Sequence, residues 1–236
     1  MKEIEGEVER IYGFHPVVEA LNNPRREFVR LLATKNAADR IASKINAEIV
    51  LPKELDRLVG SDAVHQGLVL DALPLSQPRL DQIEHKGLIL LLDQITDPHN
   101  VGAIMRSSAA FGATAVVTTA RHSAEASGVL FKAASGAYEH VPYVKVTNLS
   151  RAMIELKEYG FFIIGLDSDA QVTIEAVAAS SPIALVLGAE GKGLRQLTKQ
   201  TCDVVARLAM PGAIRSLNVS NAAAVALYAL TRAKMA

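Results

Sequence analysis

The chain has 236 residues and a mass of 25.2 kDa, which is long enough for two compact domains with buried cores. Half of its residues are hydrophobic, Trp is absent and the formal net charge is zero. This composition predicts a helix-rich α/β protein and excludes a disordered polyelectrolyte. The single cysteine, Cys202, excludes an internal disulfide and any zinc site built from cysteines.

The amino terminus is charged, and no apolar run reaches the roughly 20 residues that a bilayer requires. Together with the lone cysteine, this leads us to expect a cytoplasmic protein without a membrane span. A net charge of zero gives no general attraction for polyanions, so any basic surface must be local. Basic residues outnumber acidic ones between Asn22 and Lys44, a pattern that fits a solvated helix face as well as a phosphate-contacting surface.

The first third of the chain reads as a small α/β domain. Apolar periodicity predicts helices over His15–Asn22, Ala37–Asn46 and Lys53–Val59, and strands over Phe28–Ala33, Glu48–Leu51 and Gly67–Asp71. The segment from Pro74 to Lys86 has two prolines and no periodic apolar face, as is typical of a linker. We therefore expect a first domain over residues 1–75, a linker over 76–86 and a second domain over 87–236.

The second domain alternates apolar runs with amphipathic stretches. The runs predict strands buried on both faces, over Leu88–Leu92, Ala115–Thr118, Phe161–Leu166, Ile183–Leu187 and Val204–Met210. Helices are predicted over Ala103–Phe111, Arg151–Tyr159, Gly193–Lys199 and about Asn221–Lys234. This alternation predicts a doubly wound parallel sheet, with ligand chemistry at the carboxyl ends of its strands.

Polar residues cluster after the first of these strands, between Asp93 and Ser108. Asp97 and Pro98 favour a turn, and Asn100 can cap the helix that follows. Arg106 interrupts an otherwise small and apolar helix. It is either a surface residue of an amphipathic helix or a functional cation.

A glycine-rich loop carrying Glu190 follows the strand that ends at Leu187. Its glycines allow close approach to a ligand, but they also suit an ordinary turn. A Walker loop requires Lys where the chain has Leu194, and a dinucleotide fingerprint requires a third glycine where the chain has Gln196. Both phosphate-binding patterns fail, which disfavours a nucleotide-dependent oxidoreductase.

The third polar cluster precedes the last helix. Ser216, Asn218, Ser220 and Asn221 are more capping groups than one helix start can use, so we expect some of them to face a ligand. The six histidines do not lie at metal-ligand spacings, and we expect no catalytic metal.

In order, these segments read Asp-x-x-x-Asp-Pro-x-Asn-x-Gly-x-x-x-Arg, Gly-x-Glu-x-x-Gly and Ser-Leu-Asn-Val-Ser. Together they resemble the signature motifs of the TrmH/SpoU family of RNA ribose 2'-O-methyltransferases. Residues His15–Pro74 resemble the L30e-like substrate-binding domain of its ribosomal RNA branch. The resemblance implies a trefoil-knotted SPOUT methyltransferase domain that acts as a homodimer. It implies transfer of a methyl group from S-adenosylmethionine to a guanosine in large-subunit rRNA, with tRNA methylation or a catalytically silent rRNA-binding assembly factor as alternatives.

The same resemblance assigns residues to the site. It places the cofactor against Gly188, Leu208, Met210 and Leu217, and the catalytic positions at Asn100, Arg106, Glu190, Ser216 and Asn218. The chain has Ala209 where family members carry proline before methionine, which puts the rigidity of that loop in doubt. A guanidinium, with a pKa above about 12, accepts protons poorly near neutrality. We therefore expect Arg106 to bind the RNA phosphate and stabilise the developing alkoxide, while the proton passes to that phosphate or to water.

Overall fold

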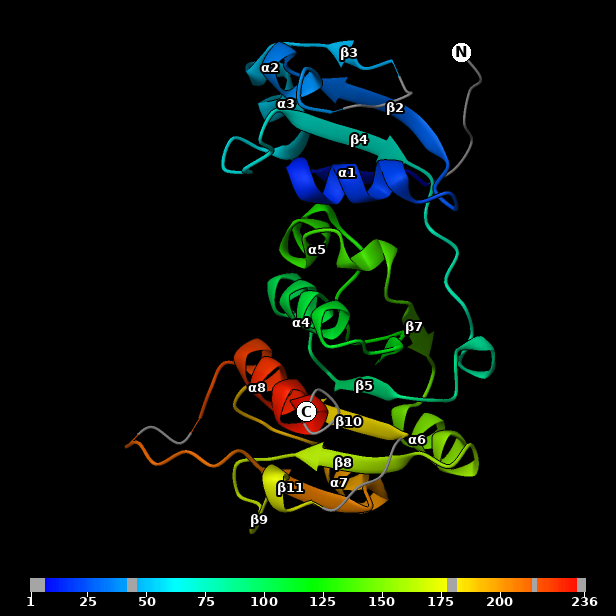
Figure 1. Ribbon diagram of the computed structural model, residues 1–236, viewed down its shortest axis with the longest axis vertical. Helices are drawn as coiled ribbons and strands as arrows, with labels where there is room; N and C mark the ends of the chain where they lie inside the picture. The colour runs from blue at the N-terminus through cyan, green and yellow to red at the C-terminus, as the bar shows by residue number, and fades with distance from the viewer. Residues whose placement is uncertain (1–6, 42–45, 178–181, 214–215, 233–236) are drawn as a thin grey trace.

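The computed structural model describes residues 7–41, 46–177, 182–213 and 216–232. It contains a four-stranded and a seven-stranded sheet, which lie at opposite ends of an elongated molecule (Figure 1). Among the described residues, no helix combines the length and the apolar character that crossing a bilayer demands.

The amino-terminal unit is a small mixed sheet with three helices. Its strands are β1 (Glu9–Tyr12), β2 (Phe28–Ala33), β3 (Glu48–Ile49) and β4 (Leu68–Ala72), in the order β1-β4-β2-β3. Its helices are α1 (Phe14–Asn22), α2 (Lys35–Ala38) and α3 (Pro52–Val59). Strand β4 pairs antiparallel with β1 and β2, whereas β2 and β3 are parallel. The predicted small α/β domain is confirmed, although β1 was not predicted.

Two of the predicted elements in this unit are too long. The helix expected over Ala37–Asn46 instead begins at Lys35 and ends at Ala38, and residues 42–45 of the expected range lie outside the described part. The strand expected over Glu48–Leu51 ends at Ile49 instead. Leu51 is the N-cap residue of α3, which begins with Pro52. Proline at the first helical position favours this early start.

The basic stretch of this unit does not form one helix face. Arg26 is buried, and Arg30 bonds to Asp71 at 2.8 Å. Arg10 bonds to the same carboxylate at 2.7 Å. Burial raises the pKa of Asp71, but the hydrogen bonds and charges of both arginines outweigh it and leave that pKa below its ordinary value. Arg26 and Arg30, both in this stretch, are therefore bonded to carboxylates, Arg26 to Glu139 and Arg30 to Asp71.

The carboxyl-terminal unit is a parallel sheet with the order β7-β6-β5-β10-β8-β11-β9. Its strands are β5 (Leu88–Asp93), β6 (Ala115–Thr119), β7 (Tyr143–Val146), β8 (Phe162–Leu166), β9 (Val172–Thr173), β10 (Ile183–Gly188) and β11 (Val204–Arg207). Along β5, Leu88, Leu90 and Leu92 enter one hydrophobic core while Ile89 and Leu91 enter another. The alternation explains why the strand is an unbroken apolar run.

Helices cover both faces of this sheet (Figure 1). One face carries α4 (Pro98–Ala110), α5 (Gly128–Ala134) and α8 (Val219–Thr231), and the other carries α6 (Leu149–Glu158) and α7 (Gln196–Thr201). Short 3-10 turns occur at η1 (Leu80–Gln82), η2 (Ala137–Glu139) and η3 (Ile174–Ala176). The predicted parallel sheet with helices on both faces is confirmed.

Several boundaries differ from the predictions. Strand β11 ends at Arg207 instead of Met210, because the chain leaves the sheet there. Helix α7 begins at Gln196 rather than Gly193, whose positive φ of 63° places it in the preceding loop. Helix α8 begins two residues early at Val219, and residues 233–236 lie outside the described part. The short elements α5, β7 and β9 were not predicted.

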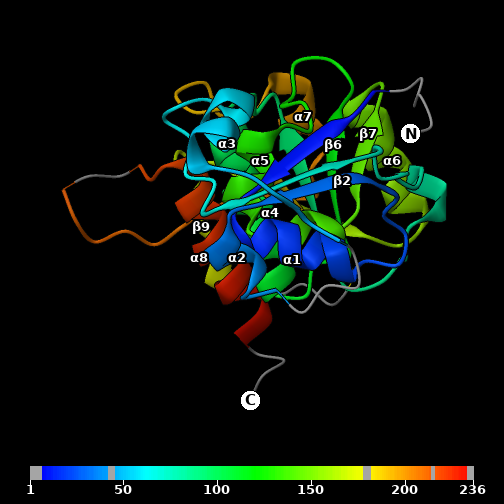
Figure 2. The same ribbon diagram turned by 90° about the horizontal axis from the view of Figure 1, so that it is seen from above.

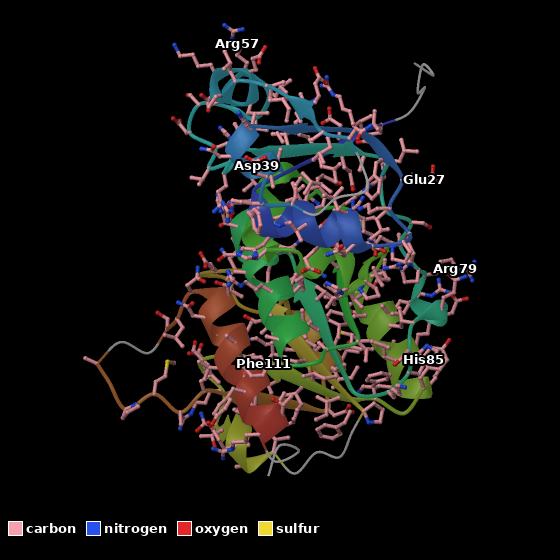
Figure 3. All side chains as sticks on the ribbon, turned by 45° about the horizontal axis from the view of Figure 1, so that its top comes forward. Glu27, Asp39, Arg57, Arg79, His85 and Phe111 are labelled. Atoms are coloured by element: carbon pink, nitrogen blue, oxygen red, sulfur yellow. The ribbon has the colours of Figure 1, made fainter. Side chains whose placement is uncertain are left out.

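The segment expected to be a linker lies against the larger unit. Leu80 and Ile83 are buried in the core beneath α6. His85 stacks on Tyr159 with ring centroids 3.7 Å apart, at the side of the molecule where Figure 3 labels His85 and Arg79. The connection between the two units is therefore anchored by buried side chains.

Candidate active site

Three residues from distant parts of the sequence form a hydrogen-bonded cluster at the carboxyl ends of β5 and β10. Asn100 lies in the first turn of α4, Glu190 follows β10, and Asn218 precedes α8. The Nδ2 group of Asn218 donates to Glu190 Oε1 at 2.6 Å and to Asn100 Oδ1 at 2.9 Å. Asn100 Nδ2 and the backbone N–H of Val219 each donate to the same Glu190 oxygen at 3.3 Å. We call Asn100, Glu190 and Asn218 the amide–carboxylate cluster.

The helix starts beside this cluster are capped by side chains. Asp97 caps α4 and accepts from the backbone N–H of His99 at 2.9 Å and from Asn100 Nδ2 at 3.1 Å. The expectation that Asn100 caps this helix is wrong, because Asp97 takes that position and leaves the Asn100 amide for the cluster. At α8, Asn218 Oδ1 accepts from the N–H of Ser220 at 2.9 Å. Helix capping thus fixes two of the three cluster residues.

The glycine-rich loop that carries Glu190 and follows β10, called the glycine loop below, folds back tightly on its own strand. A Cβ atom at Gly188 would lie 2.2 Å from the carbonyl carbon of Gly193, so only glycine fits this position. Ala189 and Gly193 form an antiparallel bridge. The far end of the loop is fixed by Arg195, which donates from Nε to the buried Asp93 at 2.6 Å and from its backbone N–H at 3.0 Å. The ends of β5 and of the loop are therefore held together.

A cavity of about 290 Å³ opens beside the loop. The four residues assigned to the cofactor, Gly188, Leu208, Met210 and Leu217, all line it. Glu190 and Ser216 line it as well, so one member of the cluster forms part of its wall. The volume is close to the lower end of the range for small-molecule sites.

Asp167 and Ser168 also line the cavity and were not predicted. They follow β8 at the same carboxyl edge, and Asp167 is paired with Lys199 at 2.5 Å. The rule that ligands bind at the carboxyl ends of parallel strands could have identified them, but the sequence there matches no binding motif.

Arg106 lies apart from the cluster. It is exposed on α4, about 9 Å along the helix axis from the buried Asn100 at 1.5 Å of rise per residue. Over residues 7–41, 46–177, 182–213 and 216–232, no hydrogen bond or ion pair involves its guanidinium. Glu190 and Ser216 therefore line the cavity, and Asn100 and Asn218 are hydrogen-bonded to Glu190. Arg106 remains available to a group outside the described chain. In the described ranges, no group of three or more acidic, His or Cys side chains is placed to hold a metal ion.

Comparison with known proteins identifies the family. The model of the SpoU rRNA Methylase family matches residues 87–228, well over half of the chain, and that of the RNA 2'-O ribose methyltransferase substrate-binding domain matches residues 10–78. The chain belongs to the SpoU rRNA methylase family. Its relatives include proteins named 23S rRNA (guanosine-2'-O-)-methyltransferase RlmB from Ralstonia nicotianae, 39% identical over 94% of both chains, and from Pseudomonas putida, 36% identical over 96% of this chain and 97% of the relative.

Solved structures of SpoU methyltransferases share the fold across both units. AviRb from Streptomyces viridochromogenes, in complex with AdoMet (S-adenosylmethionine), superimposes with a TM-score of 0.82 at 23% identity, covering 96% of this chain and 90% of its own. An AdoMet-bound rRNA methyltransferase from Sinorhizobium meliloti gives a TM-score of 0.80 at 20% identity, with coverages of 96% and 87%. The SpoU fold therefore extends over the amino-terminal unit as well as the catalytic sheet.

Proposed function

We propose that this protein transfers the methyl group of AdoMet to the 2'-hydroxyl of a guanosine ribose in 23S rRNA. The observation that carries the proposal is the cavity at the end of β10, lined by Glu190 of the amide–carboxylate cluster, in a chain 39% identical to a relative named for this reaction. We further propose a cytoplasmic homodimer. Threading of the carboxyl-terminal segment into a trefoil knot stays a prediction.

The residues around the cavity fit the cofactor. Leu208 and Leu217 give it apolar walls for an adenine ring, and Gly188 lets the backbone approach closely. Backbone groups at these positions would hold the nucleoside. AdoMet, when bound, supplies a methyl group made electrophilic by its sulfonium, so that the protein has only to position the acceptor and manage its proton.

The cluster's role is to hold the loops around that cavity in one arrangement. Glu190 Oε1 accepts three hydrogen bonds, from both amide side chains and from the first N–H of α8. A carboxylate bonded in this way links the starts of α4 and α8 to the glycine loop. Asn100, Glu190 and Asn218 therefore act by pre-organising the site.

Arg106 is the residue we assign to the RNA. Its exposed guanidinium, which has no partner among the described residues, can bind a phosphate through two parallel N–H groups and can stabilise negative charge that develops on the 2'-oxygen. Because a guanidinium stays protonated near neutral pH, the hydroxyl proton passes to the phosphate or to water.

The proposed dimer would use the exposed apolar side of α8. Val225 and Tyr228 are 45% and 54% exposed, and Tyr228 contacts the ring of Phe111 at the end of α4, which Figure 3 labels. A second copy covering this side would remove these side chains from water. The same side of the molecule carries α4, the helix of Arg106.

The test is transfer of labelled methyl from AdoMet to unmodified 23S rRNA and, separately, to bulk tRNA. We expect label at one ribose 2'-oxygen of the rRNA, and a rate about 100-fold or more lower for Arg106→Ala, as for loss of a charge-stabilising donor. Arg151→Ala, which removes an exposed arginine on α6, is the matched control and should keep the wild-type rate. Label in tRNA alone would show that the substrate is tRNA and not 23S rRNA. AdoMet binding without any methyl transfer would refute the enzymatic proposal.

A further inference from the structure

Arg26 and Glu139 form a buried ion pair between the two units. Arg26 lies between α1 and β2 in the amino-terminal unit, and Glu139 lies in η2 of the catalytic unit. The guanidinium donates from Nη2 to Glu139 Oε1 at 2.8 Å and from Nε to both carboxylate oxygens at 3.1 Å. The side chains are 0% and 3% exposed. Two opposite charges have therefore been removed from water at a domain boundary.

The surroundings of this pair satisfy its remaining groups. Arg26 Nη1 donates to Glu9 at 2.5 Å and to the carbonyl of Leu73 at 3.0 Å. Asn23 Nδ2 donates to Glu139 Oε2 at 2.7 Å. All three of these further partners, Glu9, Leu73 and Asn23, belong to the amino-terminal side of the boundary. Any other orientation of that unit would separate Glu139 from Arg26 and leave buried charges without partners, which is strongly unfavourable.

The backbone of α5 approaches the amino-terminal unit too closely to admit side chains. A Cβ atom at Gly128 would lie 2.5 Å from the ring of Tyr12 and 3.0 Å from the carbonyl oxygen of Arg10. Beyond the other end of α5, a Cβ atom at Gly136 would lie 2.4 Å from Glu19. Helix α1 lies next to α5 in Figure 1. The view from above in Figure 2 shows the amino-terminal unit over α4 and α5.

A third contact adds to this boundary. Gln66 has a positive φ of 54° and accepts, through Oε1, from the backbone N–H of Phe14 at 2.9 Å and from Lys132 of α5 at 2.7 Å. Burial lowers the pKa of the Lys132 ammonium, as expected for a cation at a closed boundary. Hydrophobic side chains of both units, Val17 and Ala20 with Leu130 and Phe131, belong to one continuous core.

We propose that Arg26 and Glu139 are positioning residues for methyl transfer: they lock the amino-terminal unit in one orientation, so that RNA bound to it is presented to the catalytic cavity at a fixed distance. This inference rests on the proposed function. The two residues touch neither the cavity nor solvent, so they act on the substrate only through the orientation of the domain.

The test uses the full chain with Glu139→Gln, which keeps the shape of the side chain but removes its charge. A second variant, Gly128→Ala, leaves the ion pair intact and inserts a methyl group between α5 and Tyr12. Glu125→Gln, which removes an exposed ion pair with Lys145 within the catalytic unit, is the matched control. Hydrogen exchange of α1 and α5 amides reports docking without reference to RNA.

We expect faster exchange in α1 and α5 for both variants. The KM for 23S rRNA should rise about tenfold, because only the docked fraction of molecules is competent, while kcat changes less than about twofold. The Kd for AdoMet should not change, and Glu125→Gln should match the wild type in every measurement. Unchanged exchange in both variants would refute the lock. Faster exchange with an unchanged KM would refute the positioning role. Absence of methylation by the wild type would refute the proposed function, and the exchange measurement would then still test whether the ion pair locks the two units together.

Discussion

Asn218 uses the two ends of one amide for two different structures. Its Nδ2 group donates to Glu190 and Asn100, whereas its Oδ1 atom accepts from the first turn of α8. An aspartate at this position retains acceptors for the helix start but has no donors, and it places a second carboxylate against Glu190. Asn218→Asp therefore keeps the cap of α8 and removes the hydrogen bonds that Asn218 donates to Asn100 and Glu190.

We expect Asn218→Asp to keep the thermal midpoint within a few degrees, because Asp is among the preferred helix caps. Its affinity for AdoMet should fall about 10- to 100-fold, the effect of losing a hydrogen bond to a charged group worth about 1.5–3 kcal/mol. Calorimetric titration and thermal unfolding measure both quantities. Ser220→Ala removes only the 2.5 Å contact of the Ser220 hydroxyl with Asn218 Oδ1 and serves as control. An unchanged AdoMet affinity for Asn218→Asp would contradict the structural role of the cluster.

At the level of residues, the identity of the site residues could be predicted from the sequence, but their contacts with one another could not. Polar and glycine residues at strand ends drew attention to the segments that hold Asn100, Glu190 and Asn218, and the family resemblance assigned these residues to the site. Their contacts join residues up to 118 positions apart, so they depend on the order of strands in the sheet. Asp167 was missed because an acidic turn after a strand has an ordinary surface explanation, and only the fold brings it to the cavity.

Among the elements, β10 and its glycine loop carry the tightest constraint in the site. A methyl group at Gly188 would meet the backbone of Gly193, which cannot rotate away as a flexible side chain can. We expect Gly188→Ala to lower the free energy of unfolding by about 1–3 kcal/mol, the usual cost of overpacking. The AdoMet affinity should fall at least about tenfold, because the loop must leave the cavity wall.

Urea unfolding and calorimetric titration measure these effects. The matched control is Gly212→Ala, since a Cβ atom at Gly212 would meet no atom within 4 Å. That variant should be as stable as the wild type or slightly more stable, because alanine restricts the unfolded chain. Equal AdoMet affinities for the two variants would show that the close approach at Gly188 has no part in forming the cavity.

The predicted elements were most accurate where burial alone determines the sequence. Strands β5, β6, β8 and β10 were located within about two residues because both of their faces are buried and most of their positions are apolar. Strand β7 was missed because it is short and only Tyr143 and Val144 are fully buried, whereas Lys145 is exposed and Val146 is partly buried. Helix α5 was missed because it is short and starts with glycine, a residue that its packing against Tyr12 requires. Neither pattern differs from a loop until its packing partner is in place, which is β6 for strand β7 and the amino-terminal unit for α5.

At the scale of the whole molecule, α8 has an apolar side that is exposed in a single copy. Tyr228 and Val225 are exposed on a helix whose other side is buried against α4 and the sheet. Ile154 on α6 is also a large hydrophobic residue and is 53% exposed, but it lies on the opposite face of the sheet. A substitution to aspartate at Tyr228 or at Ile154 therefore removes similar apolar surface from two sides of one fold.

We expect the wild type and Ile154→Asp to sediment as dimers and Tyr228→Asp to sediment as a monomer, because a carboxylate buried at an interface without a partner is strongly unfavourable. Sedimentation velocity at micromolar concentration distinguishes these states. If dimerisation also places α4 and Arg106 against the RNA, methyl transfer should fall with the dimer in Tyr228→Asp and persist in Ile154→Asp. A monomeric wild type would refute the proposed dimer, and a fully active monomeric variant would restrict the dimer to a role outside catalysis.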